Sequence, residues 1–373
     1  MPRTRSALAF LVGGVLLVGG VLLVGGSARG SQATAPVRAQ GSSFATQPAA
    51  VGELPLSSQV GRLVVLRFAG TSAPAYVREI LRDGRAAGAI LFRDNVIDPV
   101  QTKALTSQLR HGAQSTPLIC VDQEGGAIRI LPWLGPMRSA SQQGAAGTER
   151  TDAKAAARGL RVAGINVSLA PVADVASVPG AALSSRAFST DFGRAAGSVA
   201  AAVRGWRDGR VAPTVKHFPG IGGARVNTDH GSVTIARSAT QLRRQDLQPF
   251  RRAIAADVPL VMVGHARYPA VDRSRIASQS NAVIEGLLRA ELGFRGVVIT
   301  DSTEAAAVLA VSGVAQAAVR NVRAGVDIVL TTGRGSYIQV YRALLAEAKR
   351  DPVFRARVRE SAARVLALQQ KLG

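Results

Sequence analysis

The sequence predicts an α/β fold, a (β/α)8 TIM-type barrel that forms a single catalytic domain, and three observations lead to this prediction. Short apolar runs alternate with amphipathic segments from residue 57 onwards, which is typical of parallel strands covered by helices. About eight such repeats fill residues 57–373, and a barrel of this kind takes about 250 residues with insertions allowed. Polar residues also follow the apolar runs at their C-terminal ends.

The order of the elements supports the barrel over a doubly wound sheet, because that many repeats suit a closed barrel better. The expected strands are 63–68, 88–92, 117–121, 167–170, 211–215, 260–263, 297–300 and 326–330. The expected helices are 75–83, 99–111, 152–163, 192–208, 241–256, 282–292, 304–310 and 314–324, and two further helices close the chain.

Polar side chains gather where the expected strands end. They are Asp122, Asp174, Lys216, His217, His265 and Asp301. In a barrel the carboxyl ends of all strands meet at one face, where such enzymes perform their chemistry. One such residue alone could be a turn or helix-cap residue, as Asp301 could be for the helix that follows it. The whole set predicts one active site.

The N-terminal region differs from the rest of the chain. A basic start, MPRTR, precedes an uncharged apolar stretch over 7–26, which is typical of a targeting segment. We expect residues 1–28 to be a signal peptide or a membrane anchor, and residues 29–56, rich in Ser, Ala, Gln and Pro, to be a flexible linker. The barrel domain then covers 57–373. The protein is expected to be exported, either secreted or anchored at the outer face of the cell membrane.

Composition narrows the class of partner. The net charge is +22, mostly from arginine, but the charges are spread along the chain and no nucleic-acid-binding motif accompanies them. The sequence therefore indicates no nucleic acid partner, whereas an anionic cell envelope could attract this surface. Cys120 is the only cysteine and lies in an apolar run, so we expect a small buried residue and no disulfide. No pattern calls for a metal or a cofactor, and we expect a monomer.

Six motifs in a fixed order carry a family resemblance. They read VDQEGG (121–126), APVADV (170–175), SSRAF (184–188), KHFPG (216–220), GHARYP (264–269) and GFRGVVITDS (293–302). The chain resembles glycoside hydrolase family 3, and within it the single-domain β-N-acetylhexosaminidase branch, over roughly residues 57–340. No second α/β domain follows the barrel motifs, unlike in the larger two-domain β-glucosidases of the family.

The resemblance implies roles for particular residues. Asp301 matches the nucleophile that forms a covalent glycosyl-enzyme in a retaining mechanism. Asp122, Arg186, Lys216 and His217 match the positions that bind the hydroxyl groups of the sugar. Burying such a charged cluster is costly unless its members pair with each other or with a polar ligand.

The stretch after KHFPG departs from the family pattern. The branch normally reads KHFPGHG and then DSH, in which Asp and His form the acid/base dyad. Here Asn227 falls on the Asp, Asp229 on the His, and His230 comes one residue later, while Ile221 replaces another His. Three interpretations stay open. Asp229 is the acid/base, or His230 takes this role through a shift of the loop, or the loop no longer donates a proton.

A second departure concerns sugar specificity. After DQEGG the family has RVQR, whereas this chain has Ala127, Ile128, Arg129 and Ile130. One arginine that contacts the sugar is therefore missing, unless Arg129 reaches the site from a neighbouring position.

The resemblance implies an exported, retaining exo-glycoside hydrolase that removes β-linked N-acetylglucosamine or another N-acetylhexosamine from cell-wall fragments or related glycans. Its partner is a glycan with a terminal N-acetylhexosamine. One alternative is a catalytically weak or silent glycan-binding envelope protein. Another is a family 3 β-glucosidase or phosphorylase, which would prefer glucosides or depend on phosphate.

Overall fold

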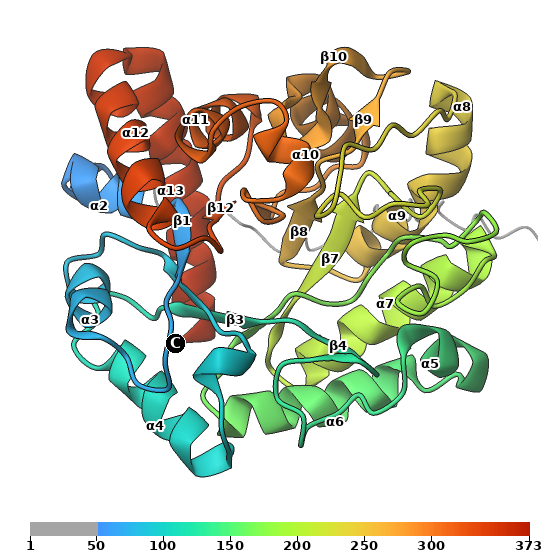
Figure 1. The fold of residues 1–373 in the computed structure, drawn as a ribbon, viewed down its shortest axis with the longest axis horizontal. Helices are drawn as coiled ribbons and strands as arrows, with labels where there is room; N and C mark the ends of the chain where they lie inside the picture. Colours follow the sequence, from blue (N-terminus) through green and yellow to red (C-terminus); the bar gives the residue numbers. More distant parts are fainter. Residues whose placement is uncertain (1–50) are drawn as a thin grey trace, which may run out of the picture. The chain divides into compact units, whose positions relative to one another are not determined.

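Eight short parallel strands form the centre of residues 51–373, the part of the chain that this computed structural model describes (Figure 1). Their order is β11-β8-β7-β6-β3-β2-β1-β12, and a parallel bridge between Ile299 and Ile328 joins the two ends of the sheet. The predicted (β/α)8 barrel is therefore confirmed. The strands are β1 (Val64–Arg67), β2 (Gly88–Ile90), β3 (Leu118–Val121), β6 (Val167–Ser168), β7 (Ala212–Phe218), β8 (Leu260–Val263), β11 (Val297–Thr300) and β12 (Val329–Leu330).

Helices lie around the outside of the strands, and two short antiparallel hairpins extend from the loops (Figure 1). The α-helices are α2 (Leu56–Gly61), α3 (Ala75–Arg82), α4 (Pro99–Arg110), α5 (Ala140–Ala146), α6 (Glu149–Val162), α7 (Phe192–Asp208), α8 (Ala239–Gln241), α9 (Gln248–Ala255), α10 (Ala306–Leu309), α11 (Val314–Ala324), α12 (Ser336–Arg350) and α13 (Pro352–Leu372). The hairpins pair β4 (Gln123–Gly125) with β5 (Ile128–Arg129), and β9 (Arg267–Tyr268) with β10 (Asp272–Ile276).

The core has two layers because neighbouring side chains of a strand point to opposite faces. Val65, Cys120 and Met262 belong to an inner apolar cluster that also contains Val365 and Leu368 of α13. The alternate strand residues pack against the surrounding helices instead. Cys120 is free and 1% exposed, so the prediction of a small buried residue is confirmed, and burial raises the pKa of its thiol.

Several element boundaries differ from the prediction. The strand expected to end at Val215 extends through Phe218, so Lys216 and His217 lie within β7 rather than after it. The helix expected over 241–256 begins with a π-helical turn, η2 (Leu242–Asp246), and the helix expected over 282–292 is π-helical throughout, η4 (Ala282–Glu291). The apolar spacing of these segments does not distinguish i→i+5 from i→i+4 hydrogen bonding, so the sequence could not show this.

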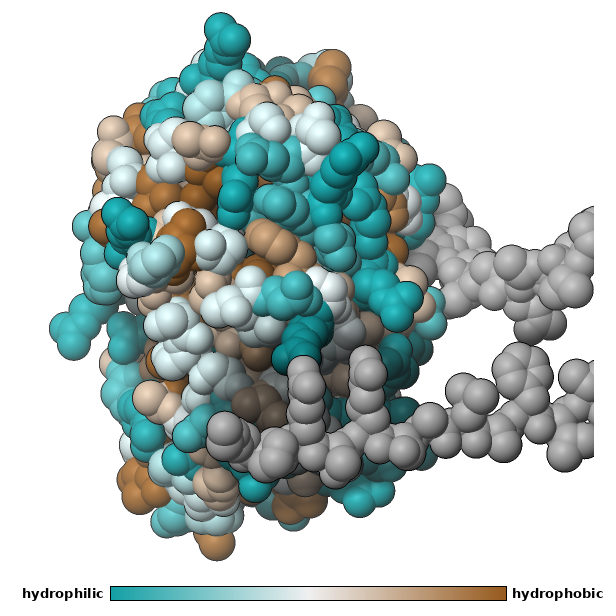
Figure 2. Space-filling model, turned by 90° about the vertical axis from the view of Figure 1, so that its right-hand side faces the viewer, coloured by the Kyte–Doolittle hydropathy of each residue, from teal (hydrophilic) through white to brown (hydrophobic). Residues whose placement is uncertain are grey.

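The predicted targeting segment 1–28 and residues 29–50 of the predicted linker lie outside the described residues. Val51 is 1% exposed and packs with Val60 and Leu63. Within residues 51–373, no helix has the length and apolar character needed to cross a membrane. On the face shown in Figure 2, hydrophilic side chains are interspersed with small apolar patches.

A buried ion cluster ties η4 and α13 to the barrel. Asp327 is fully buried just before β12, and its carboxylate accepts hydrogen bonds from Arg289 at 2.7 Å, Arg357 at 2.8 Å and Arg364 at 3.1 Å. Burial alone raises the pKa of Asp327, but the three guanidinium groups outweigh it and hold the pKa below its ordinary value. A buried carboxylate needs such partners, so this cluster is structural.

Candidate active site

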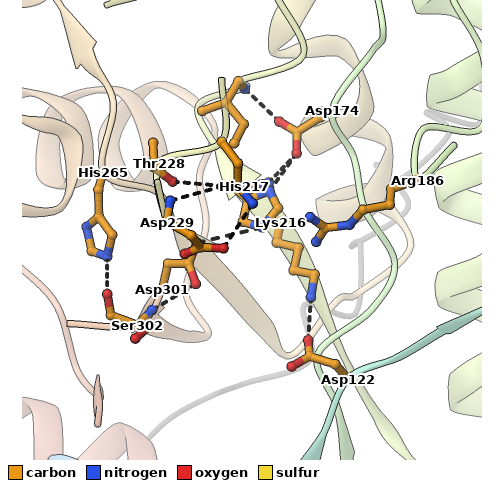
Figure 3. Close-up of polar contacts among 12 residues, drawn as sticks. Asp122, Asp174, Arg186, Lys216, His217, Thr228, Asp229, His265, Asp301 and Ser302 are labelled. Carbon is orange, nitrogen blue, oxygen red and sulfur yellow. Dashed lines mark hydrogen bonds and ion pairs between the residues drawn. The ribbon is translucent and has the colours of Figure 1, made fainter. Parts of the chain in front are cut away.

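A cavity of about 800 Å³ opens at the carboxyl ends of the strands. It lies in the upper part of the usual range for ligand pockets, about 300–1,000 Å³. Six of the expected site residues line it, namely Asp122, Arg186, Lys216, His217, Asp229 and Asp301. His230, the seventh, is exposed and is not among the lining residues. Figure 3 shows the six lining side chains together, from β7 and from the segments that follow several strands.

One wall of the cavity is an ionic network of two cations and two carboxylates. Lys216 Nζ lies 2.6 Å from Asp122 Oδ1 and 2.6 Å from Glu124 Oε1 (Figure 3 shows the first pair). Arg186 donates two hydrogen bonds of 2.8 Å to the two oxygens of Glu124. Burial alone raises the pKa of Glu124, but the charges of Lys216 and Arg186 bring it down to about 2. Glu124 is therefore ionised at neutral pH, and the formal charges of the two cations and two carboxylates balance.

His217 connects two acidic residues. Its Nδ1 lies 2.6 Å from Asp174 Oδ2, and its Nε2 lies 3.8 Å from Asp301 Oδ2. Asp174 is buried and also accepts hydrogen bonds from the backbone N–H groups of His217 at 3.1 Å and Ile221 at 2.6 Å. Asp174 thus fixes both the imidazole ring and the start of the turn after β7.

Asp301 follows β11 directly and is held from several sides. Its backbone N–H donates to Val263 of β8 at 3.0 Å, and its Oδ1 accepts from the Ser302 N–H at 2.8 Å. Burial alone raises the pKa of Asp301, but the electrostatic effect of the neighbouring His217 and the Ser302 hydrogen bond outweigh it and hold the pKa below its ordinary value. At neutral pH Asp301 is therefore a carboxylate, the form that can attack an electrophile.

His265 lies behind Asp301 rather than in the cavity. It is fully buried, with Nδ1 2.8 Å from Ser278 Oγ and Nε2 2.9 Å from the Ser302 carbonyl oxygen (Figure 3). Burial lowers the pKa of His265, so the ring is neutral and can donate its one N–H to Ser302. It therefore positions the segment after β11.

The loop after KHFPG places a carboxylate at the cavity. Asn227 Nδ2 donates to Asp229 Oδ2 at 2.9 Å, and the Asp229 N–H donates back to Asn227 Oδ1 at 3.2 Å. The carbonyl groups of Thr228 and Asp229 accept hydrogen bonds from Ala307 at 3.1 Å and Ala306 at 3.3 Å, which docks the loop on α10. The loop thus holds a hydrogen-bonded Asn–Asp pair at the cavity.

The structure also shows where the residues of the two remaining departures from the family pattern lie. Ile221 is 2% exposed and belongs to the core cluster between the strands and helices, so in this chain the position is part of the apolar core. Arg129 does not line the cavity, because its guanidinium group donates to the carbonyl oxygens of Gly126 at 2.7 Å and Pro132 at 3.1 Å.

Sequence reasoning missed several residues that line the cavity. They are Glu124, Asn227, Arg67, Phe92, Arg93, Asp94 and Thr332. Glu124 carried a usable signal, because it stands two positions after Asp122, the spacing that places side chains on one face of an extended segment. Arg67 and Arg93 carried none, since arginine is abundant throughout this chain.

Comparison with known proteins shows to which class of protein this chain belongs. A family model described as "Glycosyl hydrolase family 3 N terminal domain" matches residues 55–368. A "Beta-hexosaminidase" of Stenotrophomonas maltophilia is 35% identical over 278 residues, which are 72% of this chain and 82% of that protein. An "Uncharacterized secreted glycosyl hydrolase" of Arthroderma benhamiae is 33% identical over 85% of this chain and 94% of its own length.

Solved structures agree. A glycoside hydrolase family 3 β-N-acetylglucosaminidase from Paenibacillus sp. superposes with a TM-score of 0.82 at 35% identity, covering 86% of this chain and 63% of that one. A β-N-acetylhexosaminidase from Beutenbergia cavernae gives a TM-score of 0.77 at 31% identity, covering 85% of this chain and 99% of that one. This barrel protein is a glycoside hydrolase. It belongs to glycosyl hydrolase family 3.

Proposed function

We propose that the protein is a retaining exo-hydrolase that removes β-linked N-acetylglucosamine, or another N-acetylhexosamine, from cell-wall fragments or related glycans. The observation that carries this proposal is the ionised Asp301 at the end of β11, in one cavity with a charge-balanced network of sugar-binding side chains. The printed names of similar proteins, a β-hexosaminidase and a β-N-acetylglucosaminidase, support the substrate class.

In the proposed reaction Asp301 attacks the anomeric carbon and the bond to the leaving-group oxygen breaks. The leaving oxygen takes a proton from the general acid, which then removes a proton from the water that hydrolyses the glycosyl-Asp301 ester. Two inversions return the sugar with its β configuration. Retaining enzymes hold the two carboxyl groups about 5 Å apart.

The hydroxyl groups of the bound sugar would contact Asp122, Arg186, Lys216 and His217. In the free protein these side chains are satisfied by one another and by Glu124 and Asp174. A neutral polyol can exchange into such a network without leaving a buried charge unpaired, because its hydroxyl groups both donate and accept.

For the general acid/base we propose Asp229, because it lines the cavity and His230 does not. Asp229→Asn should lower kcat/KM by about 10²- to 10⁴-fold for a glycoside with a poor leaving group, and much less for a 2,4-dinitrophenyl glycoside, which needs no protonation. His230→Gln is the matched control. If His230→Gln instead shows this leaving-group dependence, the loop shift is correct and Asp229 is the wrong residue.

The activity itself is tested by incubating the purified protein with an aryl N-acetyl-β-glucosaminide. We expect turnover and release of β-N-acetylglucosamine. Thermal stabilisation by N-acetylglucosamine without any turnover would instead identify the silent glycan-binding alternative. Faster hydrolysis of the matching glucoside, or cleavage that requires phosphate, would identify the β-glucosidase or phosphorylase alternatives.

We also propose export, with residues 1–28 as a signal peptide or anchor and a monomeric barrel domain that binds no nucleic acid and is attracted to an anionic envelope. The linker, expected over 29–56, is proposed only up to residue 50, because Val51 packs in the folded domain and α2 begins at Leu56. The apolar start of the chain and the name of the secreted relative support export. Mass spectrometry of the protein from culture medium and from membranes would distinguish a cleaved from an anchored form. Retention of all protein in the cytoplasm contradicts the proposal.

A further inference from the structure

The proposed sugar-binding residues use only part of the barrel mouth. Asp122 follows β3, Arg186 follows β6, Lys216 and His217 lie in β7, and Asp301 follows β11. The strands β12, β1 and β2, which are hydrogen-bonded neighbours, form the remaining arc between Asp301 and Asp122 (β1 and β12 lie side by side in Figure 1). The cavity continues over this arc, where it is lined by Arg67, Phe92, Arg93, Asp94 and Thr332. We refer to these five residues as the cationic wall.

Hydrogen bonds of a buried asparagine hold the backbone of the cationic wall in place. Asn95 is fully buried, and its side-chain amide donates to the carbonyl oxygens of Phe68 at 3.1 Å and Gly70 at 2.8 Å. Its side-chain oxygen accepts the N–H of Phe92 at 2.8 Å. The segment after β2 is therefore fastened to the segment after β1, and the wall keeps its shape without a ligand.

The charge of this wall differs from that of the sugar-binding network. Arg67 lies over the ring of Phe92 at 5.0 Å, and its guanidinium donates to Asp94 Oδ2 at 3.0 Å. Arg93 is exposed to the cavity, and within residues 51–373 its guanidinium has no hydrogen-bond or ion-pair partner. Among the five lining residues, Arg67, Arg93 and Asp94 leave one positive charge at the cavity surface. The nearby Glu304 carboxylate does not line the cavity, and it accepts hydrogen bonds of 2.9 Å from the N–H and the hydroxyl group of Thr332. Arg93 is therefore the cation of this wall that has no carboxylate beside it.

We infer that the cationic wall is a second binding site, for a carboxylate on the leaving group of the glycoside. The inference rests on the proposed function, because an exo-hydrolase whose terminal sugar lies against Lys216 and Asp301 must direct the rest of the substrate to the open part of the cavity. Guanidinium groups pair with planar carboxylates through parallel N–H donors. A neutral leaving group would leave the guanidinium group of Arg93 without a charged partner. The net charge of +22 adds a long-range attraction for such substrates.

Two substrates of nearly the same shape test the inference. They are 3-carboxyphenyl N-acetyl-β-glucosaminide, which carries a negative charge on its leaving group, and 3-carbamoylphenyl N-acetyl-β-glucosaminide, which is neutral. The measured quantity is the ratio of their kcat/KM values, compared between variants so that the intrinsic reactivities cancel. We expect Arg93→Gln and Arg67→Gln each to lower this ratio by about 5-fold, as for a partly exposed charge pair. Asp94→Asn should raise it, because Arg67 loses its internal partner. Added salt should lower the wild-type ratio by screening.

Arg78→Gln is the matched control, since Arg78 is exposed on α3 and does not line the cavity. Its ratio should equal that of the wild type. If Arg67→Gln, Arg93→Gln and Asp94→Asn also leave the ratio at the wild-type value while both glycosides are hydrolysed, the inference is wrong and the proposed function stands. If neither glycoside is hydrolysed, the proposed function fails and the inference fails with it.

Discussion

Asp174→Asn tests whether the orientation of His217 matters for catalysis. The Asp174 carboxylate accepts hydrogen bonds from the His217 imidazole at 2.6 Å and from two backbone N–H groups. Asp174 itself does not line the cavity. An amide of the same shape offers one acceptor oxygen in place of two, so either the ring or the turn at Ile221 loses its partner. A hydrogen bond to a charged group contributes about 1.5–3 kcal/mol, which corresponds to a fall in kcat/KM of about 10- to 150-fold.

The assay is kcat/KM on an aryl N-acetyl-β-glucosaminide together with the melting temperature of each variant. Asp208→Asn is the control, because Asp208 is also a carboxylate that accepts side-chain hydrogen bonds, in its case from Arg150, but it lies at the surface at the end of α7. A folded Asp174→Asn protein with kcat/KM within twofold of the wild type would refute the reasoning. If Asp174→Asn does not fold, His217→Gln tests the same claim while it leaves the Asp174 carboxylate in place.

Three further predictions follow from buried charges. Burial alone raises the pKa of Asp301, but His217 outweighs it and holds the pKa below its ordinary value, so His217→Gln should move the acid limb of the pH profile of kcat/KM to higher pH. Asp327→Asn removes the nearest carboxylate of the buried Arg289 and one partner each from the half-buried Arg357 and Arg364, and it should lower the free energy of unfolding in urea by about 3–5 kcal/mol; an unchanged midpoint contradicts this. Burial raises the pKa of Asp246 from 3.8 to about 6, so the contribution of this group to stability is present below about pH 4 and is lost as the pH rises through 6. Asp246→Asn should therefore raise the melting temperature at pH 8 but not at pH 4. Equal shifts of the melting temperature at both pH values would exclude this cause.

The fold could be predicted from the sequence because each strand carries its own local signal. The run VVIT is β-branched throughout and coincides with β11, and the helix expected over 192–208 coincides with α7. The end of β7 could not be predicted in this way, because Lys216 and His217 are polar and yet buried within the strand. Their burial depends on Glu124, Asp122 and Asp174, which lie far away in the sequence.

The candidate site was predictable only in part, for a related reason. Motifs name the residues that match a known pattern, and Asp122, Arg186 and Lys216 do meet at one cavity. A motif does not show which charged residues pair with each other. Glu124 was therefore missed, although it pairs with both Arg186 and Lys216. The contrast between Asp229 at the cavity and the exposed His230 likewise depends on how the loop docks on α10, which is a tertiary contact.

Trapping of the glycosyl-enzyme tests the central claim most directly. The protein is incubated with a 5-fluoro N-acetylglucosaminyl fluoride, which forms the covalent intermediate faster than water removes it, and the labelled peptide is mapped by mass spectrometry. The account predicts one label, on Asp301, that is absent from the Asp301→Asn variant, whose melting temperature should stay close to that of the wild type. A label on any other carboxylate, or turnover by Asp301→Asn, would contradict it.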